Sequence, residues 1–281
     1  MKNNSKKTNI SKFNKQNKGT AKSTKRLYRN KFDDIKDNSL ITGKNVIYEA
    51  IKSDTKIEEI YICEGYEDNF SFVFDSKKSI TKVISKEEFE KICVGLAHNK
   101  EQKIIAKICE FKYYSVDDIL HDAHVKGQKP FLILLDEITD PMNFGSIIRS
   151  ANQAGAHGII IKEKNNCELN NVVAGASSGA IFYTKVAKVT NLSKTMDELK
   201  KSGIWFACAD MDGENMYKAN LDLPLGLVIG SEGTGVSRLV KEKCDFVVSI
   251  PMYGNIDSLN ASVSAGILMY EVVRRSNLNN E

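Results

Sequence analysis

The stretch FLILLDEITDPMNFGSIIRSANQAG, residues 131–155, decides the fold because it joins an apolar run to a helical pattern across a polar turn. Phe131–Leu135 is apolar throughout, which is typical of a strand buried on both faces of a sheet. Pro141 stiffens the turn, and we expect a helix to start near Asn143. Residues at helical spacing predict its buried side: Phe144, Ile148, Ala151 and Gly155. Strand, turn and helix in this order indicate an α/β protein.

Four further runs with β-like composition follow this stretch. They are Gly158–Ile161, Trp205–Ala209, Gly226–Ile229 and Phe246–Ile250. Helical patterns separate most of them, which predicts a parallel sheet covered by helices on both faces. In such sheets ligands bind at the carboxyl ends of the strands.

A smaller α/β unit is expected before this sheet. We predict that it spans residues 39–112, with a linker at 113–129 and the larger domain at 130–281. Its expected elements are a helix around Val46–Ile51, strands at Ile57–Cys63, Ile80–Ile84 and Lys103–Cys109, and a helix that starts at Ser85. Two capping boxes, Ser85 with Glu88 and Ser115 with Asp118, mark helix starts.

Residues 1–38 are expected to form a disordered basic arm. The first 32 residues contain eleven of the 40 Lys and Arg residues and no acid, so the 36 acidic residues outnumber the basic ones in the rest of the chain. Like-charge repulsion and few apolar groups predict disorder. Such an arm suits a polyphosphate, because neutralised phosphates release counterions. A tail that only confers solubility is the alternative.

Composition argues against several other classes of protein. The apolar runs are too short to span a bilayer, and the basic N-terminus lacks the apolar stretch of a secretory signal. The six cysteines are scattered without a CxxC pair, which indicates reduced thiols in a cytoplasmic protein. His121 and His124 have no cysteine partners nearby, so no metal site is expected.

The segment LVIGSEGTGVS, residues 227–237, predicts a ligand-binding turn after a strand. Its three glycines permit a backbone that a ligand can approach closely. It is neither a P-loop nor a complete GxGxxG motif, because Arg238 stands where the last glycine belongs. Glu232 would repel a phosphate, so a ligand with a cationic centre fits better, and S-adenosylmethionine is such a ligand. The alternative is an ordinary tight turn.

The segment IPMYGNIDSLNASVSAG, residues 250–266, predicts a strand end, a loop and a helix that starts near Ser258. The expected buried face of that helix comprises Leu259, Val263, Ile267, Tyr270 and Val273. Ser258 and Asn260 lie beside free backbone N–H groups of the first turn. Capping by Ser258 is the alternative, but it leaves Asn260 unexplained. For the first stretch, the alternatives are that Asn143 is only a helix cap and Arg149 only a surface charge.

The three segments together resemble the signature motifs of the SpoU/TrmH branch of the SPOUT RNA methyltransferases. They contain D-P-x-N-x-G-x-x-x-R, then G-S-E-G, then I-P-M-x-G-x-x-x-S-L-N, in one order from about Phe131 to Arg275. The N-terminal unit, with ITGKNVIYEAI at residues 41–51, looks like the L30e-like substrate-binding domain of that family. This pairing is similar to the ribosomal RNA guanosine 2′-O-methyltransferases of the RlmB kind.

The resemblance implies a trefoil-knotted α/β fold and a homodimer whose active site is completed across subunits. It implies transfer of a methyl group from S-adenosylmethionine to an RNA ribose, without a metal, on a guanosine of 23S ribosomal RNA. The implied cofactor contacts are Gly230, Ile250 and Leu259, with Glu232, Gly233 and Met252 nearby. The implied catalytic residues are Asn143, Arg149, Ser258 and Asn260.

One departure leaves the RNA target open. Relatives often contain His-Gln-Gly where this chain has His98-Asn-Lys, so a transfer RNA or an antibiotic-resistance site of ribosomal RNA is an alternative. A non-catalytic ribosome-assembly factor is a second alternative, although the intact catalytic set argues against it. A nucleotide-binding oxidoreductase or kinase is a third, and the missing phosphate-binding glycines argue against that.

Overall fold

The computed structural model describes residues 39–93, 102–256 and 258–278. The expected basic arm and the His98-Asn-Lys departure lie outside the described residues.

The larger sheet has six strands, and all of its strand pairs are parallel. In chain order the strands are β5 (Phe131–Asp136), β6 (Gly158–Lys162), β7 (Val186–Val189), β8 (Trp205–Asn215), β9 (Leu225–Gly230) and β10 (Phe246–Ser249). Their order in space is β10-β8-β9-β5-β6-β7. The structure thus confirms the five predicted strands and the parallel sheet. It adds β7, an edge strand of only four residues, which is too short to give a clear signal.

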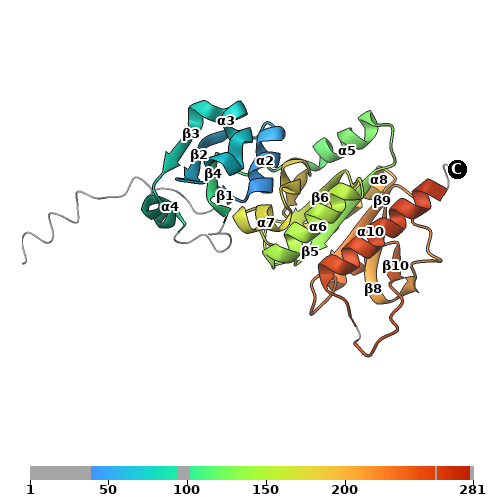
Figure 1. The fold of residues 1–281 in the computed structure, drawn as a ribbon. Helices are drawn as coiled ribbons and strands as arrows, with labels where there is room; N and C mark the ends of the chain where they lie inside the picture. The colour runs from blue at the N-terminus through green and yellow to red at the C-terminus, as the bar shows by residue number, and fades with distance from the viewer. Residues whose placement is uncertain (1–38, 94–101, 257, 279–281) are drawn as a thin grey trace, which may run out of the picture. The chain divides into compact units, whose positions relative to one another are not determined.

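Helices cover both faces of this sheet (Figure 1). They are α5 (Val116–Val125), α6 (Pro141–Gln153), α7 (Asn171–Ala176), α8 (Leu192–Lys201), α9 (Arg238–Lys241) and α10 (Ala261–Leu278), with a 3-10 turn, η5 (Ala180–Phe182). Ile133 and Leu135 of β5 pack in one apolar cluster with residues of α6 and α10. Leu132 and Leu134 pack in a second cluster with residues of α5 and α8. The alternation explains why β5 is apolar from Phe131 to Leu135.

The smaller sheet has four strands in the order β1-β4-β2-β3. They are β1 (Leu40–Thr42), β2 (Ile57–Cys63), β3 (Thr81–Ile84) and β4 (Ile104–Ile108). Its helices are α2 (Lys44–Lys52), α3 (Ser71–Lys77) and α4 (Lys86–Ile92), with 3-10 turns η2 (Glu67–Phe70) and η3 (Lys78–Ile80). Both predicted capping boxes form, at the starts of α4 and α5. Strand β1, which pairs with β4, was not predicted because it is only three residues long.

The predicted buried face of α10 is wrong at three of its five residues, whereas Ile267 and Val273 are partly buried and Ile267 packs against the core. Val263 and Tyr270 are 48% and 52% exposed, and Leu259, just before the helix, is 37% exposed. Small and apolar side chains on the other side are buried instead: Ala261, Ala265, Leu268, Met269 and Val272. The helix has apolar residues on two sides, and its contacts with α6 select the side with small side chains, which allows close approach. The other apolar side faces solvent in the single chain.

No helix in the described ranges is both long and apolar enough to cross a membrane. None of the six cysteines, all of which lie in the described ranges, forms a disulfide bond, and Cys63, Cys93 and Cys208 are buried.

Candidate active site

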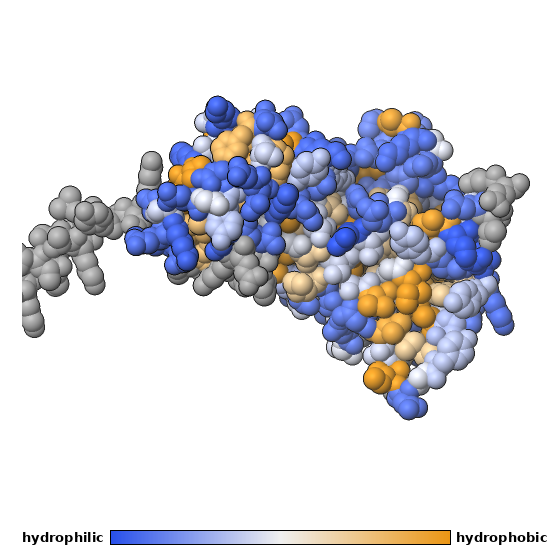
Figure 2. Space-filling view, viewed as in Figure 1, coloured by the Kyte–Doolittle hydropathy of each residue, from blue (hydrophilic) through white to orange (hydrophobic). Residues whose placement is uncertain are grey.

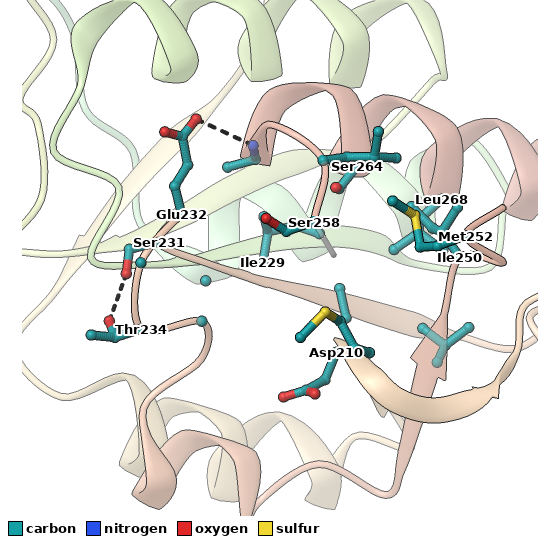
Figure 3. A pocket seen from close by; sticks show the side chains of 18 residues that line it. Asp210, Ile229, Ser231, Glu232, Thr234, Ile250, Met252, Ser258, Ser264 and Leu268 are labelled. Atoms are coloured by element: carbon teal, nitrogen blue, oxygen red, sulfur yellow. Dashed lines mark hydrogen bonds between the residues drawn. The ribbon is translucent and has the colours of Figure 1, made fainter. Parts of the chain in front are cut away.

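A pocket of about 270 Å³ lies at the carboxyl ends of β9 and β10, beside the middle of β8 (Figure 3). All six predicted cofactor contacts line it, together with Ser258: Gly230, Glu232, Gly233, Ile250, Met252 and Leu259. Its floor is apolar, with Ile229, Val248 and Leu268. The molecular surface over β8 and β10, next to α10, is also apolar (Figure 2). The structure therefore brings the turn at Gly230–Gly235, called the glycine turn below, together with the 250–260 segment at one concave site.

The glycine turn folds back on itself to form one wall of the pocket. Ser231 and Gly235 exchange two backbone hydrogen bonds, of 3.1 and 3.0 Å, and the hydroxyls of Ser231 and Thr234 lie 2.7 Å apart. A Cβ atom on Gly230 would lie 2.0 Å from the carbonyl carbon of Gly235. Only glycine therefore fits at position 230, because the two ends of the turn touch backbone to backbone.

A hydrogen-bonded cluster joins the three sequence motifs beside the pocket. The Asn143 side-chain amide donates to Glu232 Oε1 at 2.9 Å, and the Asn260 amide donates to Asn143 Oδ1 at 2.9 Å and to Glu232 Oε1. The Ala261 backbone N–H also donates to Glu232, at 3.4 Å. One carboxylate thus fixes the starts of α6 and α10 relative to the glycine turn.

The capping alternatives for these residues fail or prove incomplete. Helix α6 begins at Pro141, and Asp140 is its cap, accepting from the Met142 N–H at 3.0 Å, so Asn143 is not a cap. Helix α10 begins at Ala261 rather than near Ser258, and the side-chain oxygen Oδ1 of Asn260 caps it by accepting from the Ser262 N–H at 3.0 Å. Capping uses the side-chain oxygen of Asn260, and the side-chain NH2 group donates to Asn143 and Glu232.

The charges of the pocket suit a cationic ligand better than a phosphate. Among the described residues that line it, none is Lys or Arg, and two are the carboxylates Asp210 and Glu232. Asp210 is ion-paired with Lys241 at 2.6 Å, and this hydrogen bond lowers the pKa of the Asp210 carboxyl. Within the described ranges, the hydrogen-bond donors to Glu232 are the neutral amides of the cluster. It is therefore available as a countercharge for a sulfonium or an amine.

Arg149 lies on an exposed part of α6 and does not line the pocket. Its Nη1 donates to the hydroxyl of Ser178 at 3.0 Å. The other arginines in the described part of the chain each form an ion pair with a glutamate: Arg238 with Glu242, and Arg274 and Arg275 with Glu271. No such ion pair forms to Arg149 among the described residues. Its charge is therefore available for an external anion.

Two residues near the site were missed by sequence reasoning. Asp136, the last residue of β5, is fully buried and accepts a hydrogen bond from the Ser237 N–H at 2.8 Å, at the end of the glycine turn. Its carboxylate also lies 2.7 Å from Lys162 Nζ on β6. Asp210 is the second residue that was missed. It was not predicted because nothing in the sequence around β8 marks that strand as part of the pocket. An acidic residue at the end of a buried strand was the available signal for Asp136.

Comparison with known proteins assigns the family. The model of the SpoU rRNA methylase family matches residues 130–270. YacO of Bacillus subtilis, whose name places it among the TrmH family tRNA/rRNA methyltransferases, is 41% identical over 243 residues, covering 84% of this chain and 96% of YacO. The chain belongs to the SpoU rRNA methylase family. This confirms the resemblance of the three motifs, while the RlmB kind stays a prediction.

Further relatives of this SpoU family member agree in sequence or in fold. A TrmH family protein of Staphylococcus haemolyticus is 39% identical and covers 84% of this chain and 95% of its own length. The SpoU methyltransferase AviRb of Streptomyces viridochromogenes, solved in complex with AdoMet, has a TM-score of 0.71 at 24% identity, covering 85% of this chain and 90% of AviRb. An RNA 2′-O ribose methyltransferase has a TM-score of 0.70 at 23% identity, covering 92% and 96%.

The described residues of this SpoU family member contain no group of three or more His, Cys, Asp or Glu side chains that could hold a metal ion. Of the four predicted catalytic residues, the structure brings Asn143, Ser258 and Asn260 to the pocket or its edge. It places Arg149 on another part of α6, beside Ser178.

Proposed function

We propose that this protein transfers a methyl group from S-adenosylmethionine to a ribose 2′-hydroxyl of RNA. One observation carries the proposal: Glu232 binds the amides of both Asn143 and Asn260 at the rim of the pocket. The three family motifs are far apart in the sequence, and this contact gathers them at one place. The AdoMet complex of AviRb, which has the same fold, adds support.

S-adenosylmethionine suits the residues of the pocket. Bound there, it would supply a methyl group already activated by a positively charged sulfur. Gly230, Ile250 and Leu259 would contact it, with Gly233 and Met252 nearby. Glu232 would face its positive charge, since no Lys or Arg among the described lining residues competes for that carboxylate.

The chain's own residues would orient the ribose, bind the neighbouring phosphate and stabilise the negative charge that develops on the ribose oxygen. Asn143, Ser258 and Asn260 would position the ribose hydroxyl, and such alignment can supply several kcal/mol of a barrier. Arg149 would bind the neighbouring phosphate and stabilise the developing oxyanion, because its guanidinium has no carboxylate partner in the described structure. Arg149 is not assigned as the general base, because a guanidinium stays protonated.

The finer assignments belong to the same proposal. A guanosine of 23S ribosomal RNA is the proposed target, and a transfer RNA or a resistance-type ribosomal site is the alternative. We propose cytoplasmic location, a trefoil knot in the larger domain, an L30e-like smaller domain at 39–112, a linker at 113–129 and a homodimer. The unburied apolar side of α10 and the position of Arg149 outside the pocket lining support a partner subunit that completes the site.

The test is to incubate the purified chain with ribosomal RNA and S-adenosylmethionine labelled in the methyl group, and then to identify the labelled nucleoside. We expect a 2′-O-methyl nucleoside with the wild type and a loss of at least about 100-fold in turnover with Arg149→Ala. Base-methylated product would overturn the ribose assignment. Cofactor binding without transfer to any RNA would favour the non-catalytic assembly factor.

A further inference from the structure

The turn after α7 has an unusual residue at the position that ends the helix. The Ser178 N–H donates to the Gly175 carbonyl at 3.0 Å, and the Gly179 N–H donates to the Ala174 carbonyl at 3.2 Å. These two bonds define a Schellman motif, in which the residue after the C-cap adopts a left-handed conformation. Ser178 is that residue, with φ of 51°.

Glycine normally holds this position, because it has no Cβ to clash in the left-handed region. The chain follows that preference after three other helices, and Asp54 after α2 is a second exception. Helices α5, α6 and α8 end in the same bond pattern, with Gly127, Gly155 and Gly203 at the equivalent position and φ of 63°, 72° and 80°. Serine after α7 therefore keeps a strained backbone that glycine would relieve, and strained residues of this kind cluster at functional sites.

The side chain that glycine would lack has a specific contact. The Ser178 hydroxyl oxygen accepts the hydrogen bond from Arg149 Nη1 at 3.0 Å. Close packing of α7 on α6 sets this distance, since a Cβ atom on Gly145 of α6 would lie 2.4 Å from Ala176 Cβ. The only described arginine without a glutamate partner is thus held by a hydroxyl.

A neutral acceptor has a property that a carboxylate lacks. It fixes the direction of the guanidinium but leaves its charge uncompensated, so an RNA phosphate can still bind to the remaining N–H groups. A carboxylate at the same place would orient Arg149 and also compete with the phosphate.

We propose that Ser178 is a positioning residue, which aims Arg149 at the RNA phosphate while leaving its positive charge free. This inference rests on the proposed function, because it takes Arg149 as the residue that binds the substrate. At position 178 the chain keeps a strained, less stable backbone because the serine side chain orients Arg149.

The experiment compares four substitutions at this site in the full-length chain. Ser178→Gly relieves the strain and removes the hydroxyl, so we expect a melting temperature a few degrees higher but a kcat about tenfold lower. Ser178→Ala should lower kcat equally without the gain in stability. Ser178→Asn, which tolerates the left-handed region and supplies a neutral acceptor, should restore most of kcat. Ser178→Asp should raise KM for RNA, and the affinity for S-adenosylmethionine should be unchanged throughout.

The matched control is Asp54→Gly. Asp54 follows α2 in the same bond pattern, with φ of 58°, and is exposed. Relief of strain there should raise the melting temperature and leave kcat unchanged.

The outcomes separate the two proposals. If Arg149→Ala keeps normal turnover, the assigned role of Arg149 fails, and with it the role of Ser178. If Arg149→Ala loses turnover while Ser178→Gly and Ser178→Ala keep wild-type kcat, only the Ser178 inference is overturned. If Ser178→Gly lowers kcat and does so just as much in the Arg149→Ala background, Ser178 does not act through Arg149, which also overturns it.

Discussion

Asp136 shows how one buried side chain connects the core to the candidate active site. Its carboxylate is fully buried at the end of β5, where it binds the Ser237 N–H and pairs with Lys162. Burial alone would raise its pKa, but Lys162 and Ser237 stabilise the charged form and leave the pKa lowered. The end of the glycine turn is thereby held by the Asp136 carboxylate in its ionised form.

The sign of the pH dependence follows from that lowered pKa. The contribution of Asp136 to stability is fully present above the carboxyl pKa of the unfolded chain, and it is lost as the pH falls through the lower pKa of the folded protein. We expect Asp136→Asn to reduce the free energy of unfolding by about 2 kcal/mol at pH 7 and by less near pH 3. Urea unfolding at both pH values measures the difference.

A matched control is Asp197→Asn. Asp197 also pairs with a lysine, Lys243, at 2.8 Å, but both side chains are more than 40% exposed. Exposed pairs contribute little, so this variant should unfold like the wild type at both pH values. An equal loss for Asp136→Asn at pH 7 and pH 3 would mean that its charge is not the stabilising feature.

At the scale of single residues, the motifs predicted the pocket but not its supports. Gly230, Glu232 and Asn260 lie where the motifs indicated. Asp136 and Ser178 act through contacts with residues distant in sequence, Ser237 and Arg149. Such contacts arise only when the strands and helices pack, so no local pattern reveals them.

At the scale of elements, strands were more predictable than helix faces. Buried parallel strands are apolar at nearly every position, so β5 and β9 stand out. Helix α10 is apolar on two sides, and periodicity cannot tell which side meets the sheet and which remains exposed. The wrong prediction for Val263 and Tyr270 therefore reflects a real second apolar face.

The Arg149–Ser178 hydrogen bond depends on the contact between helices α6 and α7. A Cβ on Gly145 would lie 2.4 Å from Ala176 Cβ and 2.8 Å from the Val173 carbonyl oxygen. We therefore expect Gly145→Ala to destabilise the protein by about 1–3 kcal/mol by overpacking. Chemical denaturation measures this loss.

At Gly175, on α7 itself, we expect the opposite effect of an alanine substitution on stability. A Cβ there would meet nothing within 4 Å, so Gly175→Ala should stabilise the helix by about 0.5–1 kcal/mol. If both variants changed the free energy of unfolding in the same direction, close helix packing at Gly145 would not be the cause.

At the scale of the whole molecule, the N-terminal arm is a predicted RNA contact. The first 32 residues contain eleven basic residues and no acid. Deleting them should weaken RNA binding and flatten its dependence on salt, because fewer phosphate counterions would be released. Titrations at several salt concentrations measure the slope. Unchanged affinity at low salt would show that the arm does not contact RNA.

The central claim is that the pocket between the glycine turn and the 250–260 segment binds a cationic methyl donor. Calorimetric titration of the full-length chain with S-adenosylmethionine tests it most directly, with ATP and the Gly230→Ala variant in parallel. We predict saturable binding of S-adenosylmethionine to the wild type, none to Gly230→Ala, where the added Cβ would lie 2.0 Å from the Gly235 backbone, and none of ATP. A folded wild-type chain that fails to bind S-adenosylmethionine, or that binds ATP equally well, would contradict the account.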